Sequence, residues 1–180
     1  KSKPGTFSMM AHAVINCPNL EKAIQRSAQF YRLVDLPMEI RLERGDRESR
    51  LILLPPVFES RENVLETMVF ISVRFWSWLT GRNLDPSAIH FDFAEPPQAA
   101  EFRRLFKGKV VYADRQSAVV FPTSWLSLPL VQNPLSLSKF LKDSLALIIV
   151  GNAQPIGLPE QIRAIISKEY GNSFPDFAQV

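Results

Sequence analysis

The sequence is poor in the features that mark secreted and membrane proteins. It has one cysteine, Cys17, so an intrachain disulfide is impossible, and its first residues, KSKPGTFSMM, lack the apolar run of a signal peptide. The longest apolar segment, Thr67 to Leu79, is interrupted by Arg74 and is too short to span a bilayer. These absences predict a protein of the reducing cytoplasm that does not enter a membrane.

Signatures of common catalytic sites are also missing. The sequence has two histidines, no glycine-rich phosphate loop, no Ser-His-Asp ordering and no recognisable carboxylate pair. A metal site usually takes three or four ligands, and neither His90 nor Cys17 has companions at metal-binding spacing. The sequence therefore gives no positive case for an enzyme, and we expect neither a metal nor another cofactor.

The charge balance is mild. The chain of 180 residues has 21 basic and 18 acidic side chains, a formal net charge of +3 and 46% hydrophobic residues. Its densest basic stretches, Arg41 to Arg50 and Arg103 to Lys109, do not resemble a basic arm that holds nucleic acid. Length and composition suit one soluble domain, or one domain with a short attachment, and charge alone does not predict DNA binding.

Hydrophobic periodicity and chain breakers predict a mixture of helices and strands. Asn19 is placed to cap a helix, and Gly45 with Asp46 lies in the turn of a hairpin. Hairpins dominate the strand pairs, which favours an α+β fold with a mostly antiparallel sheet of about five strands flanked by helices. The expected helices are 7–15, 19–34, 60–81, 96–106, 134–150 and 158–170, and the expected strands are 38–43, RLILLPP, 88–93, 110–113 and 118–121.

Two polar side chains share one side of the expected strand 88–93. Because side chains alternate along a strand, His90 and Asp92 fall on the side opposite Ile89. One interpretation is a small enzyme that uses His90 and Asp92. The interpretation that we favour is a solvent-facing polar side of a strand that packs by its other face.

Arg74 is the more informative charge, because it interrupts an otherwise apolar helix. A buried guanidinium is costly without a partner, which is either a protein carboxylate or an anionic ligand. Aromatic walls with a few polar groups are the usual form of a small-molecule site, so we predict a ligand site at Arg74, Phe75 and Trp78 together with Tyr31. The alternative is that the aromatic rings are ordinary core and Arg74 extends to water.

Four motifs follow one another between Phe7 and Leu137: the helix NLEKAIQRSAQFY, the strand IHFDFAEPP, the short helix AEFRRLF and the ending VVFPTSWLSLPL, which is followed by NPLSL. The last motif begins in the second strand of an expected hairpin that joins 110–113 and 118–121. In this order, the motifs resemble the arabinose-binding-type N-terminal domain of AraC-type bacterial transcription regulators. Phe93 stands where relatives often carry His. The final GNSFPDFAQV is similar to the entry of that family's C-terminal helix-turn-helix module.

The resemblance implies a regulatory domain that binds an unknown small-molecule effector and forms a homodimer. It implies an effector-binding and dimerisation domain over 1–150 and a linker with a linker helix over 151–171. Residues 172–180 would begin a DNA-binding module. The helix-turn-helix motifs of that module, which contact promoter DNA, would lie beyond Val180. The fold alternative is a cupin-like β-sandwich with helices, known in other AraC-type sensors. The functional alternative to effector binding is a ligand-free module that dimerises.

The helix 134–150 is our expected dimer interface. Its apolar stripe is wide enough to serve both a core and a partner. The residues that make up this stripe are Leu137, Leu141, Leu145 and Ile148.

Overall fold

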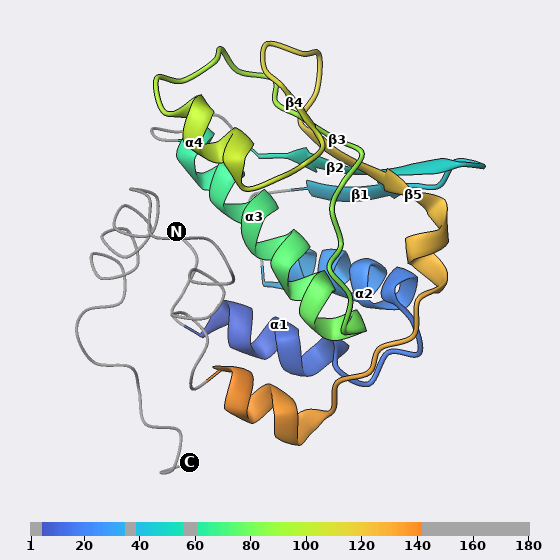
Figure 1. The fold of residues 1–180 in the computed structure, drawn as a ribbon. Coiled ribbons are helices and arrows are strands. Elements are labelled where there is room, and N and C mark those ends of the chain that lie inside the picture. The colour runs from blue at the N-terminus through green and yellow to red at the C-terminus, as the bar shows by residue number, and fades with distance from the viewer. Residues whose placement is uncertain (1–4, 35–38, 56–60, 142–180) are drawn as a thin grey trace.

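An open five-stranded sheet with helices on one side forms the centre of the computed structural model (Figure 1). The structure describes residues 5–34, 39–55 and 61–141. Its strands are β1 (Glu39–Glu43), β2 (Glu48–Leu54), β3 (Ala88–His90), β4 (Lys109–Val111) and β5 (Ala118–Pro122), in the order β1-β2-β5-β3-β4. All neighbouring strands are antiparallel except β3 and β4, which confirms the predicted α+β fold. The described strands form one open sheet, so the cupin-like sandwich is wrong for this part of the chain.

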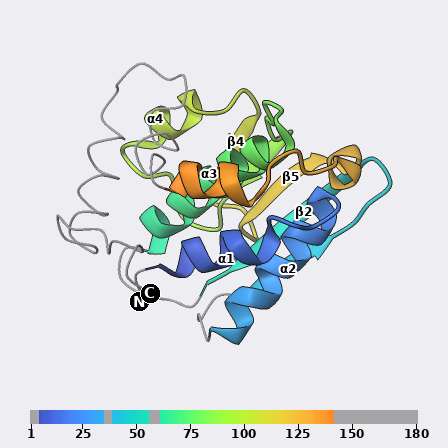
Figure 2. The same cartoon turned by 90° about the horizontal axis from the view of Figure 1, so that it is seen from below.

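Three helices cover one face of the sheet. They are α1 (Thr6–Val14), α2 (Leu20–Leu33) and α3 (Arg61–Thr80), while the short α4 (Ala99–Arg104) lies near β4 at the edge of the sheet (Figure 1). Residues 134–141 form a further helix, and α1 lies between it and α2 (Figure 2). The sequence predicted each of these helices, although helix ends differ by a few residues.

Helix ends follow local chemistry. The Asn19 side chain accepts a hydrogen bond from the Lys22 backbone N–H at 3.0 Å and caps α2, as predicted. The long helix α3 ends at Gly81, whose φ of +63° lies in the left-handed region that glycine adopts without strain. A Cβ at Gly81 would also approach Cγ2 of Val131 to 2.9 Å, so the Val131 side chain would have to shift to accept a larger residue at this position.

The core fills the space between the sheet and the helices. Nine of the 20 residues of α3 are buried and three are exposed, in line with a helix that is apolar on most sides. Strand β2 contributes Leu51 and Leu53, and strand β5 contributes Val119 and Phe121. The largest fully buried side chains come from all layers of the structure: Phe91, Phe102, Phe121, Leu20, Leu65, Leu79, Ile89, Leu126 and Leu137.

The predicted hairpin between 110–113 and 118–121 is wrong. Both strands exist, but β3 lies between them, antiparallel to β5 and parallel to β4. The connection from β3 to β4 runs through α4, which gives it the length that a parallel crossover needs. Strand β3 is also shorter than predicted and ends at His90, although the alternation of half-buried and buried side chains continues to Phe93.

Several predictions lie outside the described residues. They are the start of the helix 60–81 at residue 60, the continuation of the helix 134–150 beyond residue 141, the linker and helix over 151–171, and the segment 172–180.

Candidate functional site

Four aromatic rings form a cluster on α3, which we call the Trp78 cluster. Phe75 stacks on Trp78 with ring centroids 5.9 Å apart, and Phe7 of α1 meets Phe75 edge-on at 5.3 Å. Phe140 of the helix 134–141 stacks on Trp78 at 4.1 Å and lies 6.0 Å from Phe75. The structure thus brings the predicted site residues Phe75 and Trp78 together, and the chain itself supplies the ring that covers them.

Arg74 lies one helical turn from Trp78, so the two residues share one side of α3. Its guanidinium carbon is 5.4 Å from the centre of the Phe70 ring, a cation–π distance. Burial lowers the pKa of the guanidinium, and the carboxylate of Asp85 opposes that shift. The buried Nε of Arg74 has no hydrogen-bond partner among the described residues, so it retains a free donor.

Tyr31 lies near the end of α2, where its ring meets Phe30 edge-on with centroids 5.8 Å apart. It packs as a partly buried side chain against the core. Three of the four predicted ligand residues, Arg74, Phe75 and Trp78, therefore lie close together on α3. The fourth, Tyr31, lies on α2. Their joint use as a ligand site stays a prediction.

Glu66 is a buried acid that the sequence analysis missed. It is 6% exposed, and one carboxylate oxygen accepts a hydrogen bond from the Tyr112 hydroxyl at 2.8 Å. Burial raises the pKa of Glu66, and the hydrogen bond from Tyr112 opposes this shift. The available signal was helical spacing, because Glu66 lies one turn from the buried Phe70 and therefore on an inward side of α3.

His90 and Asp92 lie on one side of the chain, as predicted, but each has its own partner. His90 Nδ1 lies 2.5 Å from a carboxylate oxygen of Asp114. Asp92 accepts hydrogen bonds from Arg61 at 2.5 Å and from the Ser117 hydroxyl at 2.6 Å. Burial raises the pKa of Asp92, but the bonds from Ser117 and Arg61 outweigh it, so its pKa is lowered. The Arg61–Asp92 ion pair and the two hydrogen bonds connect residues 90–92 with α3 and with the loop before β5.

The family model for the arabinose-binding domain of AraC transcription regulators, N-terminal, matches residues 1–130. The chain belongs to this family. The resemblance read from the motifs is therefore confirmed, and this AraC-type domain belongs to a family of transcription regulators and not to an enzyme family.

A curated relative of this AraC-type domain is the ornithine utilization regulator of Pseudomonas aeruginosa (strain PAO1). The two are 24% identical over 174 residues, which cover 95% of this chain and 51% of the relative. The chain thus spans about half the length of this relative.

The predicted dimer residues of this AraC-type domain fall in different environments. Leu137 is fully buried in the core, and Leu141 is partly buried against it. Leu145 and Ile148 lie outside the described residues. The interface stays a prediction.

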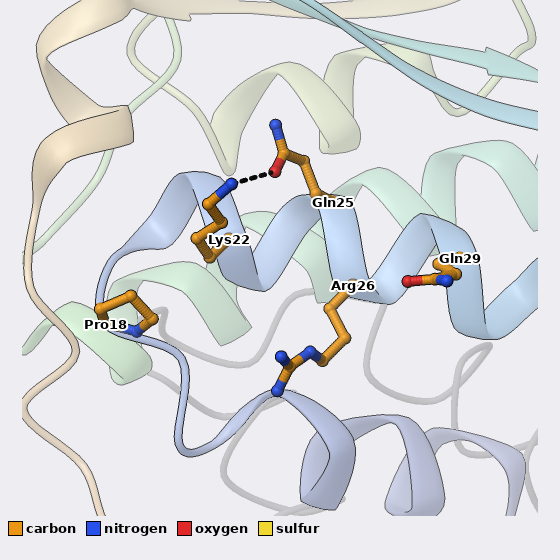
Figure 3. Close-up of a pocket in the computed structure, with 5 residues that line it drawn as sticks. All are labelled: Pro18, Lys22, Gln25, Arg26 and Gln29. Atoms are coloured by element: carbon orange, nitrogen blue, oxygen red, sulfur yellow. Dashed lines mark hydrogen bonds between the residues drawn. The ribbon is translucent and has the colours of Figure 1, made fainter.

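A surface hollow of about 350 Å³ lies on the outward side of α2 (Figure 3). Lys22 Nζ donates to Gln25 Oε1 at 3.2 Å, and Arg26 donates to the Ala13 carbonyl at 3.3 Å. The predicted ligand residues are not among those that line it, which are Pro18, Lys22, Gln25, Arg26 and Gln29. The hollow is a shallow surface feature lined by none of the predicted ligand residues, which makes it a weak candidate for the ligand site.

Other chemistry finds little support in the described part of this AraC-type domain. Burial raises the pKa of the Cys17 thiol, partly opposed by Arg26, which favours the unreactive protonated form. Within residues 5–34, 39–55 and 61–141, no group of three or more acidic, histidine or cysteine side chains is arranged to hold a metal ion. No helix in these ranges is long and apolar enough to cross a membrane.

Proposed function

We propose that this chain is the effector-binding and dimerisation domain of a cytoplasmic AraC-type transcription regulator. The family match over residues 1–130 carries this proposal. In it, residues 1–150 bind a small molecule and form a homodimer, residues 151–171 are the linker, and residues 172–180 begin the module that contacts promoter DNA. The effector must bind two states of the regulator with different affinity, because a ligand with equal affinity shifts no equilibrium.

The effector site proposed is the side of α3 that carries Arg74, Phe75 and Trp78, with Tyr31 from α2. Two observations support it. Arg74 keeps a buried Nε–H without a hydrogen-bond partner among the described residues, which suits an anionic group. Phe75, the next residue, and Trp78, one turn away, stack on each other, and the Phe140 ring contacts both.

Thermal-shift measurements on the 180-residue chain test this site. The panel contains amino acids, sugars, fatty acids and nucleotides, and it includes ornithine because the Pseudomonas aeruginosa relative is named for ornithine utilization. A true effector at saturation, at about 100 times its Kd, stabilises the folded chain by about 2.7 kcal/mol. The shift should disappear in Arg74→Ala and persist in Arg104→Ala, which removes an exposed arginine from α4.

Two results would contradict the proposal. A ligand that stabilises wild type and Arg74→Ala equally removes Arg74 from the site. If no compound of the panel stabilises the chain while it still dimerises, the module that only dimerises becomes the better description.

A further inference from the structure

The Phe140 ring stacks on Trp78, a residue of the proposed effector site. The two rings are nearly parallel, at 20° with centroids 4.1 Å apart, and this is the shortest ring–ring separation in the Trp78 cluster. Such an offset stack is a favourable arrangement for two aromatic side chains. The flat surface proposed for the effector is therefore filled by the chain's own helix.

The segment that carries Phe140 is fixed to the same end of α3. The Val131 N–H donates to the Leu79 carbonyl at 2.9 Å, and the Gln132 side chain donates to the Trp78 carbonyl at 2.8 Å. Both the main chain and the ring of Trp78 thus hold the segment that contains residues 131–141. A ligand that contacts Trp78 acts on the residue that anchors this segment.

The helix 134–141 is held on one side. Leu137 is fully buried, whereas Leu135 is 82% exposed and Lys139 points to solvent. Short helical segments gain most of their stability from tertiary contacts, so the described turns over 134–141 are stabilised by the contacts of Phe140 with α3. Removal of the Phe140 ring from its position should therefore loosen the helix as well as expose Trp78.

We propose that Phe140 is an internal, displaceable occupant of the effector site. A small molecule that joins a flat apolar group to an anionic group binds with its flat group on Trp78 in place of Phe140 and its anionic group at Arg74. Because it replaces Phe140, its binding releases the helix 134–141, through which the chain continues into residues 142–180. This inference rests on the proposed function, since it uses the same effector site.

The proposal makes ligand affinity depend on helix docking. When only the molecules with an undocked helix can bind, the apparent Kd equals the intrinsic Kd divided by the undocked fraction. The coupling is reciprocal, so a bound ligand raises the undocked fraction by the same factor. Helix release and ligand affinity must therefore change together.

The test uses phenylacetate as the probe, with phenylacetamide as its uncharged control, on the 180-residue chain. Calorimetry should show phenylacetate binding at least about tenfold tighter to Phe140→Ala than to wild type, because the competing ring is gone. Phe140→Leu, which keeps an apolar side chain for helix packing, should fall between them. Leu135→Ala, a truncation on the exposed side of the same helix, should bind as wild type does.

Helix release is measured by trypsin cleavage after Lys139, an exposed residue of the helix. Saturating phenylacetate should accelerate this cleavage in wild type, and Phe140→Ala should accelerate it without any ligand. Cleavage after Lys109 in β4 serves as the internal control for global unfolding. Loss of the preference for phenylacetate over phenylacetamide in Arg74→Ala would support the anionic subsite.

Equal phenylacetate affinity in wild type and Phe140→Ala overturns the proposal. So does tight binding to Phe140→Ala with unchanged cleavage of wild type, since the variant would then have gained an ordinary cavity. If an effector from the panel binds wild type and Phe140→Ala with equal affinity, the proposed function stands and only this inference is wrong. If Phe140→Ala is cleaved faster than wild type but no compound binds either protein in any assay, both this inference and the proposed effector binding are wrong.

Discussion

Two carboxyl groups of this AraC-type domain show how a single residue's surroundings decide its chemistry. The Ser117 hydroxyl donates a hydrogen bond to Asp92 and Arg61 adds an opposite charge, so the lowered pKa of Asp92 contributes stability that is lost as the pH falls through that pKa. Glu66 accepts its hydrogen bond from the neutral Tyr112 hydroxyl, and no cation among the described residues opposes the effect of its burial. Burial therefore dominates and raises its pKa.

The Glu66→Gln variant should be more stable than wild type at neutral pH. Because the folded-state pKa of Glu66 is raised, the folded chain holds this proton over a range where the unfolded chain has lost it, and stability falls as the pH rises through that range. Glutamine removes the buried charge and keeps an acceptor for Tyr112, for a gain of roughly 1 kcal/mol.

Urea unfolding at neutral and at acidic pH measures the Glu66→Gln effect. The two proteins should approach equal stability in acid, where Glu66 is protonated in both the folded and the unfolded chain. Glu62→Gln, which changes an exposed carboxyl in the first turn of the same helix, is the control. A stability difference that does not change with pH would show that charge burial is not its cause.

At the scale of elements, helices were predicted well because their signals are local. The Asn19 cap, the apolar run of α3 and Gly81 each act within one or two turns of the chain, and each lies where the sequence placed it. The pairing of strands was predicted less well, since short strands such as β3 and β4 carry no information on their neighbours. The insertion of β3 between β4 and β5 depends on contacts that are distant in sequence.

In the candidate site, too, the features with local sequence signals were predicted, and those that depend on distant contacts were not. Phe75 and Trp78 could be singled out because their helical spacing places aromatic rings together beside Arg74. Phe140 could not, because its stack on Trp78 joins two helices that the sequence does not orient relative to each other. The prediction thus found one wall of the cluster and missed the ring that covers it.

Asn19→Ala tests whether the α2 cap acts as the structure shows. The Asn19 side chain satisfies the Lys22 N–H, and its removal should cost about 1 kcal/mol of stability. Asn19→Asp, which retains an oxygen acceptor at the cap, should stay within a few tenths of a kcal/mol of wild type. Thermal unfolding followed by circular dichroism measures both, and equal losses in the two variants would show that the side-chain oxygen does not stabilise the helix.

At the scale of the whole molecule, the position of Leu137 changes what a dimer through the helix 134–150 would require. Leu137 is fully buried within this chain, and Leu141 is partly buried against the core, so the first part of the stripe is already used. A stripe that serves both a core and a partner must then present its later positions to the partner. This reasoning makes Leu145 and Ile148 the more informative positions for testing the proposed interface.

Leu145→Glu should convert a dimer of the 180-residue chain into a monomer, because a charge buried between two copies without a partner is strongly unfavourable. Leu141→Glu should also weaken the dimer, with a loss of monomer stability since Leu141 packs on the core. Leu137→Ala is the matched control, with an expected cost of about 2–5 kcal/mol in stability through a core cavity. Sedimentation velocity measures the mass and circular dichroism the fold, and dimers that persist in both glutamate variants, or unfolding of both, would exclude this helix as the interface.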